Sequence, residues 1–350
     1  MIDILPSDPM MRELKWDHLV TFSIKTPLRP NLKEPALILD MIARNFLRNI
    51  QRIQWMILTP SLVGDLTIHI QRHFDIAELN LTGLLPATLD SSQNPRRDEI
   101  AALAQNFFRV DTQEILAAVG TPEYEQFFLN AIKLGTQPVT MLAGEGAPAR
   151  QGIEAMLSSS ITGTWTAVET MLGDLWEAAL NIHPKTLAEL KGKRKRFQQS
   201  DTDNAATPPD DQDEPDSESL KSVPLNEILR REFDIKNWMG SVLRTRRRFD
   251  HLAGIREAYA LAFSKDFNVI DSCLKNDVLD SLSAVRNLIV HRSSIVDATY
   301  ERRAKHLTIP AAPIGFSIFL DGEIVRDLMN AAIICSLQLI VAVDDWIAAN

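Results

Sequence analysis

An acidic, proline-containing segment at residues 198–219 separates two helical parts of the chain and limits how they can fold. It contains no lysine or arginine and almost no apolar residues. A segment of this composition cannot bury enough surface to offset the entropy lost on ordering, so we predict a disordered linker there. Its eight acidic residues are Asp201, Asp203, Asp210, Asp211, Asp213, Glu214, Asp216 and Glu218. The helices before and after this linker must therefore close one core together.

The linker also accounts for most of the net charge. The whole chain carries a formal charge of −9 at pH 7, and without the eight linker carboxylates the rest is close to neutral. An acidic total of this kind does not exclude nucleic acid as a partner, because basic residues still gather locally.

Apolar residues recur at helical spacing through most of the C-terminal part, so we expect a mainly α fold there. The spacing predicts helices at residues 151–180, 225–233, 238–245, 254–263, 264–268, 277–290 and 323–349. A short strand is predicted at residues 316–320, before the turn at Asp321–Gly322. We assign residues 151–350 to one helical bundle that contains the linker.

The remaining residues, 1–147, are expected to form a second, mostly helical domain of unknown role. A chain of 350 residues is long for a single hydrophobic core. Helices are predicted at residues 34–58, 98–110 and 112–119, with Asp111 as an N-cap, and a short strand is predicted at residues 19–25.

Residence in the cytoplasm is the default expectation, without membrane contact. No uninterrupted apolar run reaches the roughly 18 residues that span a bilayer. The apolar stretch at residues 331–343 is interrupted by Ser336 and Gln338, so we predict a buried helix. Two cysteines give neither a disulfide framework nor zinc-ligand spacing, and the N-terminus lacks a secretory signal pattern.

Polar residues interrupt the predicted helix at residues 277–290 and its continuation. Asn287 and His291 are four residues apart and so share one helix face, and the long side chain of Arg286 can reach the same place. Leaving such groups buried and unpaired costs on the order of 1–3 kcal/mol each, so something must satisfy them.

The arrangement of Arg286, Asn287 and His291 resembles the signature of the HEPN superfamily, in which an arginine and a polar residue precede a histidine on a late helix. The resemblance covers roughly residues 156–346, including a long first helix that carries Glu169 and Asp174. It implies a homodimeric, metal-independent endoribonuclease of a bacterial-type defence or toxin system, with RNA as substrate and no cofactor. An antitoxin or regulatory protein is a further implied partner. Ser293 stands where some toxin members carry a tyrosine that their antitoxin modifies, so that form of control is not expected.

The residue types suit this chemistry. His291 can exchange a proton at neutral pH, and Arg286 can hold a phosphate through its forked guanidinium. Asn287 would orient His291 or the phosphate, and Glu169 and Asp174 are candidate orienting groups from the first helix. The alternative is a non-catalytic HEPN-type module that binds RNA or protein or serves only for dimerisation, with the three residues as a satisfied polar patch.

Basic residues elsewhere are candidates for contact with the RNA backbone. They are Arg292, the cluster Arg244, Arg246, Arg247 and Arg248, and Lys193 and Arg194 beside the linker. A solvated surface is the alternative for each. Arg44, Arg48 and Arg52 are more typical of an exposed helix face. His69 and His73 have metal-ligand spacing but lack the glutamate of a zinc-protease arrangement, so no metal site is predicted.

Overall fold

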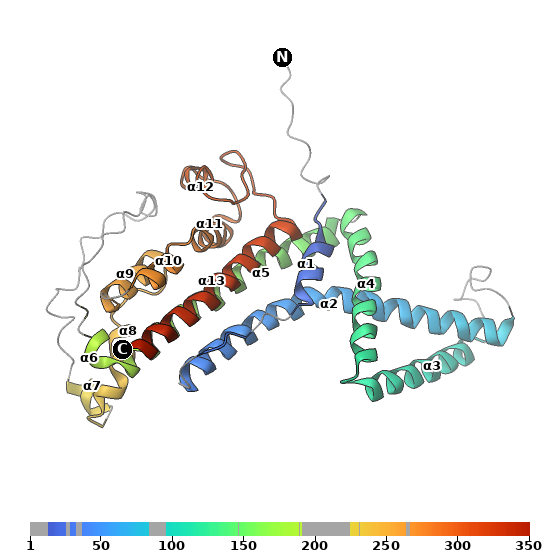
Figure 1. Ribbon diagram of the computed structural model, residues 1–350. Helices are drawn as coiled ribbons and strands as arrows, with labels where there is room; N and C mark the ends of the chain where they lie inside the picture. Colours follow the sequence, from blue (N-terminus) through green and yellow to red (C-terminus); the bar gives the residue numbers. More distant parts are fainter. Residues whose placement is uncertain are drawn as a thin grey trace, which may run out of the picture. The chain divides into compact units, whose positions relative to one another are not determined.

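The computed structural model is mainly α-helical (Figure 1). It describes residues 13–25, 29–32, 37–83, 96–145, 147–188, 190, 225–230, 232–263 and 267–350. No strand occurs among these residues, and the only extended pairing is an antiparallel bridge between Ile295 and Ser317. The predicted linker at 198–219, together with Lys193 and Arg194, lies outside the described residues.

The chain divides into two compact units that alternate along the sequence. The first unit comprises residues 1–25, 54–156 and 321–323, and the second comprises residues 26–53, 157–320 and 324–350. Three long helices therefore contribute residues to both units: α2 (Leu37–Thr82), α5 (Ala147–Ile182) and α13 (Gly322–Ala349).

The first unit is built from α1 (Trp16–Ser23), α3 (Arg97–Ala118), α4 (Pro122–Glu145) and the adjoining part of α2. Helix α1 packs on α4 and buries Trp16, Leu19 and Val20. Helices α2 and α4 cross closely, because a Cβ atom added at Gly135 would lie 1.7 Å from the backbone oxygen of Ser61. A side chain at this position would push the two helices apart.

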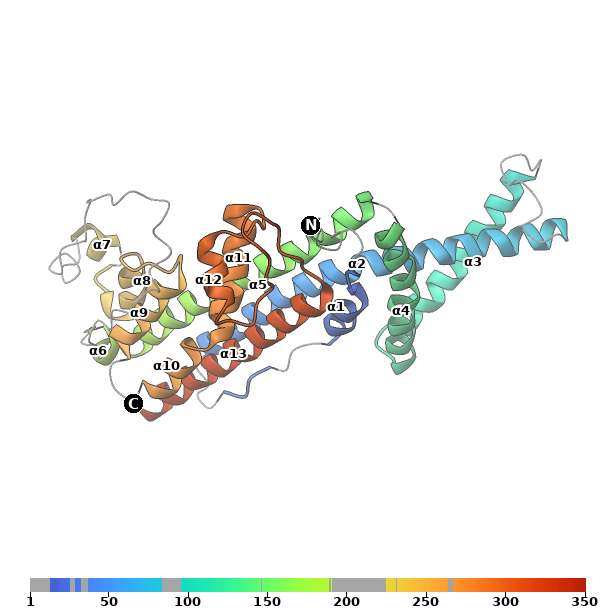
Figure 2. The same ribbon diagram turned by 90° about the horizontal axis from the view of Figure 1, so that it is seen from above.

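The second unit is organised around α5 and α13, which overlap along one line in Figure 1 and run nearly parallel in Figure 2, where part of α2 appears between them. Short helices pack around this pair: α6 (Pro184–Leu187), α7 (Leu225–Arg230), the 3₁₀ turn η5 (Ile235–Trp238), α8 (Met239–Arg244), α9 (Leu252–Ala262), α10 (Asn268–Leu274), α11 (Asp277–Arg292) and α12 (Ala298–Ala304). Two deep hydrogen bonds join α9 to α5. The Trp176 indole donates to the Ala258 oxygen at 3.0 Å, and the Tyr259 hydroxyl donates to the Leu172 oxygen at 2.8 Å.

The composition of helix α13 fits either a membrane-spanning helix or a buried core helix. Among the described helices it is the one long and apolar enough to cross a membrane, but 61% of its most apolar window is buried inside the protein. Residues such as Leu339, Ile340 and Val343 are at most 1% exposed. Packing in the core accounts for the apolar composition of this helix, as the sequence predicted.

Several predicted elements are wrong in kind or in extent. Residues 19–25 belong to α1 and its end rather than to a strand, and residues 316–320 make only the single bridge. The two helices predicted at 98–110 and 112–119 form one helix, α3, so Asp111 lies inside it and does not cap. Helix α2 continues 24 residues beyond the predicted end at 58, with Pro60 inside it, and α12 was not predicted.

Candidate functional site

The motif helix α11 has defined ends. The Asn276 side chain caps its start by accepting a hydrogen bond from the Val278 backbone N–H at 3.0 Å. Its last turn carries His291 and Arg292, and the helix dipole favours the positive charge of Arg292 at this end. The backbone then turns left-handed at Ser293, with φ of 50°, and leaves His291 exposed on the final turn.

Arg286, Asn287 and His291 lie together in the structure. Nη1 of Arg286 donates to Oδ1 of Asn287 at 2.9 Å and lies 3.5 Å from Nε2 of His291. Residues five apart in a helix lie on different sides of it, so the long Arg286 side chain curves around the helix to reach His291. Because a guanidinium nitrogen can only donate, this contact suits the imidazole tautomer that carries its proton on Nδ1.

The guanidinium of Arg286 retains unused donor capacity. Its Nε is buried and has no hydrogen-bond partner among the described residues. Asn287 and Arg286 are half-buried, while His291 is open to solvent. The arrangement therefore presents a fixed cation beside an accessible proton-transfer group.

Glu169 approaches the motif from α5. Burial raises the pKa of its carboxyl, while the charge of Arg286 and the indole of Trp165 oppose that rise. In the described part of the chain, Glu169 and Arg286 make no direct ion pair, so their interaction acts through space. The structure places this predicted orienting group in the electrostatic surroundings of Arg286.

The second predicted orienting residue, Asp174, is placed elsewhere. Its Oδ1 lies 2.6 Å from Nη1 of Arg244, and the same nitrogen lies 2.9 Å from Oε2 of Glu177. The Arg244 guanidinium also lies 5.9 Å from the ring centroid of Phe249. Asp174 and Arg244 therefore bind each other and hold α8 on α5, and the structure does not bring either one to the motif.

The other candidate RNA contacts differ in accessibility. Arg248 and Arg292 are exposed, and Arg292 pairs with Asp297 at 3.3 Å. Arg246 and Arg247 are half-buried and take part in interactions of their own. Arg248 and Arg292 thus remain accessible to a polyanion.

A histidine with a carboxylate partner lies just before α9, close in sequence to the arginine cluster 244–248. Nδ1 of His251 lies 2.8 Å from Oδ1 of Asp250. The charge of Asp250 also acts on Glu169, where it raises the carboxyl pKa. The adjacent Asp–His pair in the sequence was the available signal for this feature.

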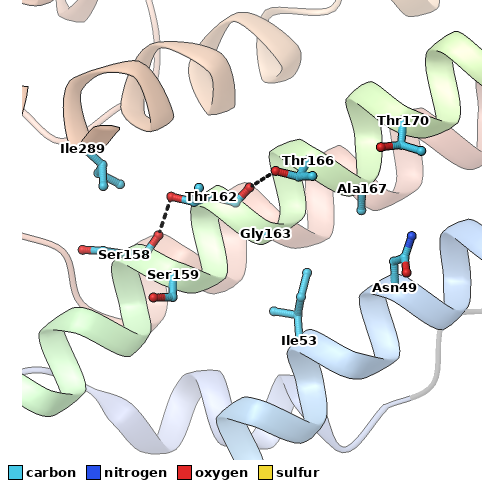
Figure 3. A pocket seen from close by; sticks show the side chains of 10 residues that line it. All are labelled: Asn49, Ile53, Ser158, Ser159, Thr162, Gly163, Thr166, Ala167, Thr170 and Ile289. Carbon is cyan, nitrogen blue, oxygen red and sulfur yellow. Dashed lines mark hydrogen bonds between the residues drawn. The ribbon is translucent and has the colours of Figure 1, made fainter. Parts of the chain in front are cut away.

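A pocket of about 510 Å³ borders the motif helix (Figure 3). Ile289, which stands between Asn287 and His291 in the sequence, forms one wall. The others are Asn49, Ile53, Ser158, Ser159, Thr162, Gly163, Thr166, Ala167 and Thr170. The hydroxyls of Thr162 and Thr166 donate along α5 to the oxygens of Ser158 and Thr162, both at 3.0 Å. They can still accept hydrogen bonds, so the pocket is polar on its α5 side.

The described residues contain no group of three or more histidine, cysteine or acidic side chains arranged to hold a metal ion. His69 lies 3.6 Å from Asp65, and His73 lies 3.2 Å from Asp111. Each of these histidines thus faces a carboxylate. Arg44 pairs with Asp40 at 2.7 Å, and Arg48 and Arg52 are exposed.

No family model, no curated protein and no solved structure matches this chain. A proposal on its function therefore rests on the sequence and on the geometry of the site.

Proposed function

We propose that the chain is a metal-independent endoribonuclease of the HEPN type, with His291 as a proton-transfer group and Arg286 as the phosphate clamp. The observation that carries the proposal is the contact of a single Arg286 nitrogen with both Asn287 and His291. It places a permanent cation beside an exposed imidazole at the end of α11. Phosphodiester transfer without a metal needs both groups in one place.

The proposed reaction is an internal transfer. In this proposal Nη1 of Arg286 turns from Nε2 of His291 to the phosphate, and the freed Nε2 lone pair takes the proton of an RNA 2′-hydroxyl. The 2′-oxygen then forms a bond to the adjacent phosphorus. The bond from phosphorus to the 5′-oxygen breaks, and that oxygen takes a proton from solvent water as it leaves. The products carry a 2′,3′-cyclic phosphate and a 5′-hydroxyl. Arg286 stabilises the extra negative charge on the phosphorane, and Asn287 holds Arg286 in place.

The surroundings of the motif support an RNA substrate and a homodimer. Arg248 and Arg292 supply exposed positive charge. Val290, Ile295 and Phe316 are 47%, 45% and 54% exposed, and they lie on the motif helix or on the bridged segments that follow it. Exposed apolar side chains that gather on one surface are typical of a protein interface. We include in the proposal a cytoplasmic defence or toxin role, with a regulatory protein as partner.

The contact between Arg286 and His291 also favours a second candidate, a non-catalytic module that binds RNA or protein. In the described structure Nε2 of His291 faces Arg286 rather than open solvent alone. A module of this kind would use the two side chains as a fixed polar surface.

The deciding experiment compares the wild-type chain with Arg286→Ala and His291→Ala on total RNA and tRNA in the presence of EDTA. His306→Ala serves as a matched control, because His306 is an exposed histidine outside the motif. We expect the wild type and the control to leave cyclic phosphate ends and the two motif variants to lose cleavage. Full activity in His291→Ala, products with 5′-phosphates, or a strict metal requirement would contradict the nuclease assignment. RNA binding that survives in both variants without any cleavage by the wild type would favour the binding module.

A further inference from the structure

Residues of α1 and α4, with Glu13 just before α1, line a pocket of about 780 Å³ in the first unit. This volume falls in the range of about 300–1,000 Å³ that is typical of pockets for small molecules. None of Arg286, Asn287 and His291 lines it, and the proposed reaction assigns no role to this part of the chain. The pocket therefore shares no residue with the proposed nuclease site.

Both walls of the pocket are held by contacts outside it. The Gly322 N–H donates to the Leu14 oxygen at 2.7 Å, just before α1, and the Gln54 side chain donates to the Lys25 oxygen at 2.9 Å, just after it. Helix α4 is held by its close crossing with α2 at Gly135. A pocket with walls fixed in this way is formed before any ligand binds.

The floor of the pocket is apolar. Val20 and Ile132 are 3% and 1% exposed, and Thr136 beside them is also buried. The Thr136 hydroxyl is already satisfied, because it lies 2.9 Å from the Ser61 hydroxyl and 2.6 Å from the Ile132 oxygen. The other apolar lining residues are more exposed: Ile24, Leu129 and Met141. This surface suits the hydrocarbon part of a ligand, whose removal from water is favourable.

The charged residues of the pocket are exposed and do not pair across it. Glu13 and Asp17 come from the α1 side, and Lys133 comes from α4. In the described part of the chain, Lys133 makes no ion pair with either carboxylate. Asp17 lies 3.9 Å from His18, which is a cation only when protonated, and Lys15 binds the carboxylates at the start of α13 instead. Two carboxylates and one ammonium therefore surround the pocket.

We propose that this pocket binds an amphipathic cation, a small molecule with a hydrocarbon body and one amine or guanidinium group. The hydrocarbon body lies on Val20 and Ile132, and the positive group lies at the rim beside Glu13 and Asp17. Charge complementarity favours a cation over an anion, since carboxylates outnumber the ammonium in the lining. This inference goes beyond the proposed function and does not rest on it.

The test compares octylamine, octanol and octanoate, which share one hydrocarbon chain and differ in their head groups. Isothermal titration calorimetry with the full chain at about pH 8, where the amine is a cation, measures the affinity of each. We expect octylamine to bind at one site per chain, about fivefold more tightly than octanol, because exposed ion pairs contribute modestly. Octanoate should bind most weakly of the three.

Two kinds of variant locate the binding. Glu13→Gln combined with Asp17→Asn should remove the preference for octylamine and leave octanol binding unchanged, whereas Glu114→Gln, at an exposed glutamate outside the pocket, should keep it. Gln137→Trp, at an exposed lining residue, should fill the mouth of the pocket and weaken the binding of all three ligands. Its matched control is Gln126→Trp, at an exposed residue of α4 that does not line the pocket.

Circular dichroism checks that each variant keeps its helical fold. The proposal would be overturned by a lack of saturable octylamine binding, by tighter binding of octanoate than of octylamine, or by equal binding in Gln137→Trp and Gln126→Trp. None of these measurements involves RNA, so their failure leaves the nuclease proposal standing, and a failure of RNA cleavage leaves this one standing.

Discussion

Arg256 on α9 binds Asp280 on α11 through both carboxylate oxygens, with Nη1 to Oδ1 at 3.0 Å and Nη2 to Oδ2 at 2.7 Å. Its Nε donates to the backbone oxygen of Leu274, at the end of α10, at 2.7 Å. One guanidinium therefore ties three helices together. Because α11 carries the motif, this contact fixes the motif helix to α9 and α10.

Replacing Arg256 with leucine should lower the free energy of unfolding by about 2 kcal/mol, because it leaves a carboxylate and a backbone oxygen without their donor. Urea unfolding followed by circular dichroism measures the change. The matched control is Lys275→Ala, which removes an exposed pair with Asp271 at 2.6 Å and should cost no more than about 0.5 kcal/mol. Equal losses in the two variants would show that the Arg256 contacts stabilise the fold no more than an exposed ion pair does.

The long helices of the second unit were predictable because their periodicity is a local property of the sequence. Residues 151–180 and 323–349 carry apolar side chains at helical spacing, and α5 and α13 cover these ranges. A continuous buried stripe fixes a helix whatever its partners are. The coarse, mainly α fold follows from the same signal.

The strand predicted at residues 19–25 is wrong because such a short apolar segment can form either a strand or a helix. Packing against the rest of the fold decides between the two. The alternation at residues 19–25 suits a strand, but Leu19 and Val20 are buried together with Trp16 against α4. That helix begins 99 residues after α1 ends, so no local pattern contains the information. Local sequence also failed to predict the role of Asp111. It was expected to cap a helix, but in the structure its carboxylate pairs with His73 on α2.

The candidate site was predictable only where the residues share one helix. Arg286, Asn287 and His291 come together because they are neighbours on α11. Asp174 was an equally plausible orienting group by sequence, but its carboxylate is bound by Arg244, 70 residues away. Such long-range ion pairs depend on how α8 docks on α5, which the spacing of residues does not encode.

Gly240 allows α8 to approach α5 closely, so Gly240→Ala should destabilise the chain by roughly 3 kcal/mol. A Cβ atom there would lie 2.1 Å from the backbone oxygen of Glu177, and the Gly240 N–H donates to Asn181 at 2.7 Å. The control is Gly152→Ala, because Gly152 is a helical glycine with open space around it. That change should stabilise by about 0.5–1 kcal/mol. Thermal and urea unfolding of both variants measure the difference, and a tolerated Gly240→Ala would contradict the close approach.

The stability of the fold should respond to the ionisation of Glu169. Burial raises the pKa of this carboxyl in the folded chain above its unfolded value, despite the opposing charge of Arg286. The folded state then holds the proton more tightly, so this stabilisation is present below the unfolded pKa and is lost as the pH rises through the folded pKa. Glu169→Gln cannot ionise and should escape that loss.

Urea unfolding of Glu169→Gln and wild type at about pH 4 and about pH 7 checks this prediction. We expect a gain for the variant at neutral pH, under about 1 kcal/mol, that shrinks at the acidic pH. Glu114→Gln, at an exposed glutamate of α3, should show no such pH-dependent difference. A loss of stability in Glu169→Gln at neutral pH would mean that the attraction to Arg286 outweighs the cost of burial.

Arg286 should not be replaceable by lysine, although the charge is kept. Its Nη1 contacts both Asn287 and His291, and a planar fork can hold Asn287 and a phosphate at the same time. We expect Arg286→Lys to lower kcat/KM for RNA cleavage by about 100-fold, because a lysine ammonium reaches fewer of these positions. Arg292→Lys is the matched control, since Arg292 is exposed one residue after His291 and pairs only with Asp297 at 3.3 Å among the contacts described. Its cleavage rate should stay within a few-fold of wild type, with a modest change in salt dependence. Equal activities of the two lysine variants would show that Arg286 contributes charge alone, and the clamp role would then pass to a general basic surface.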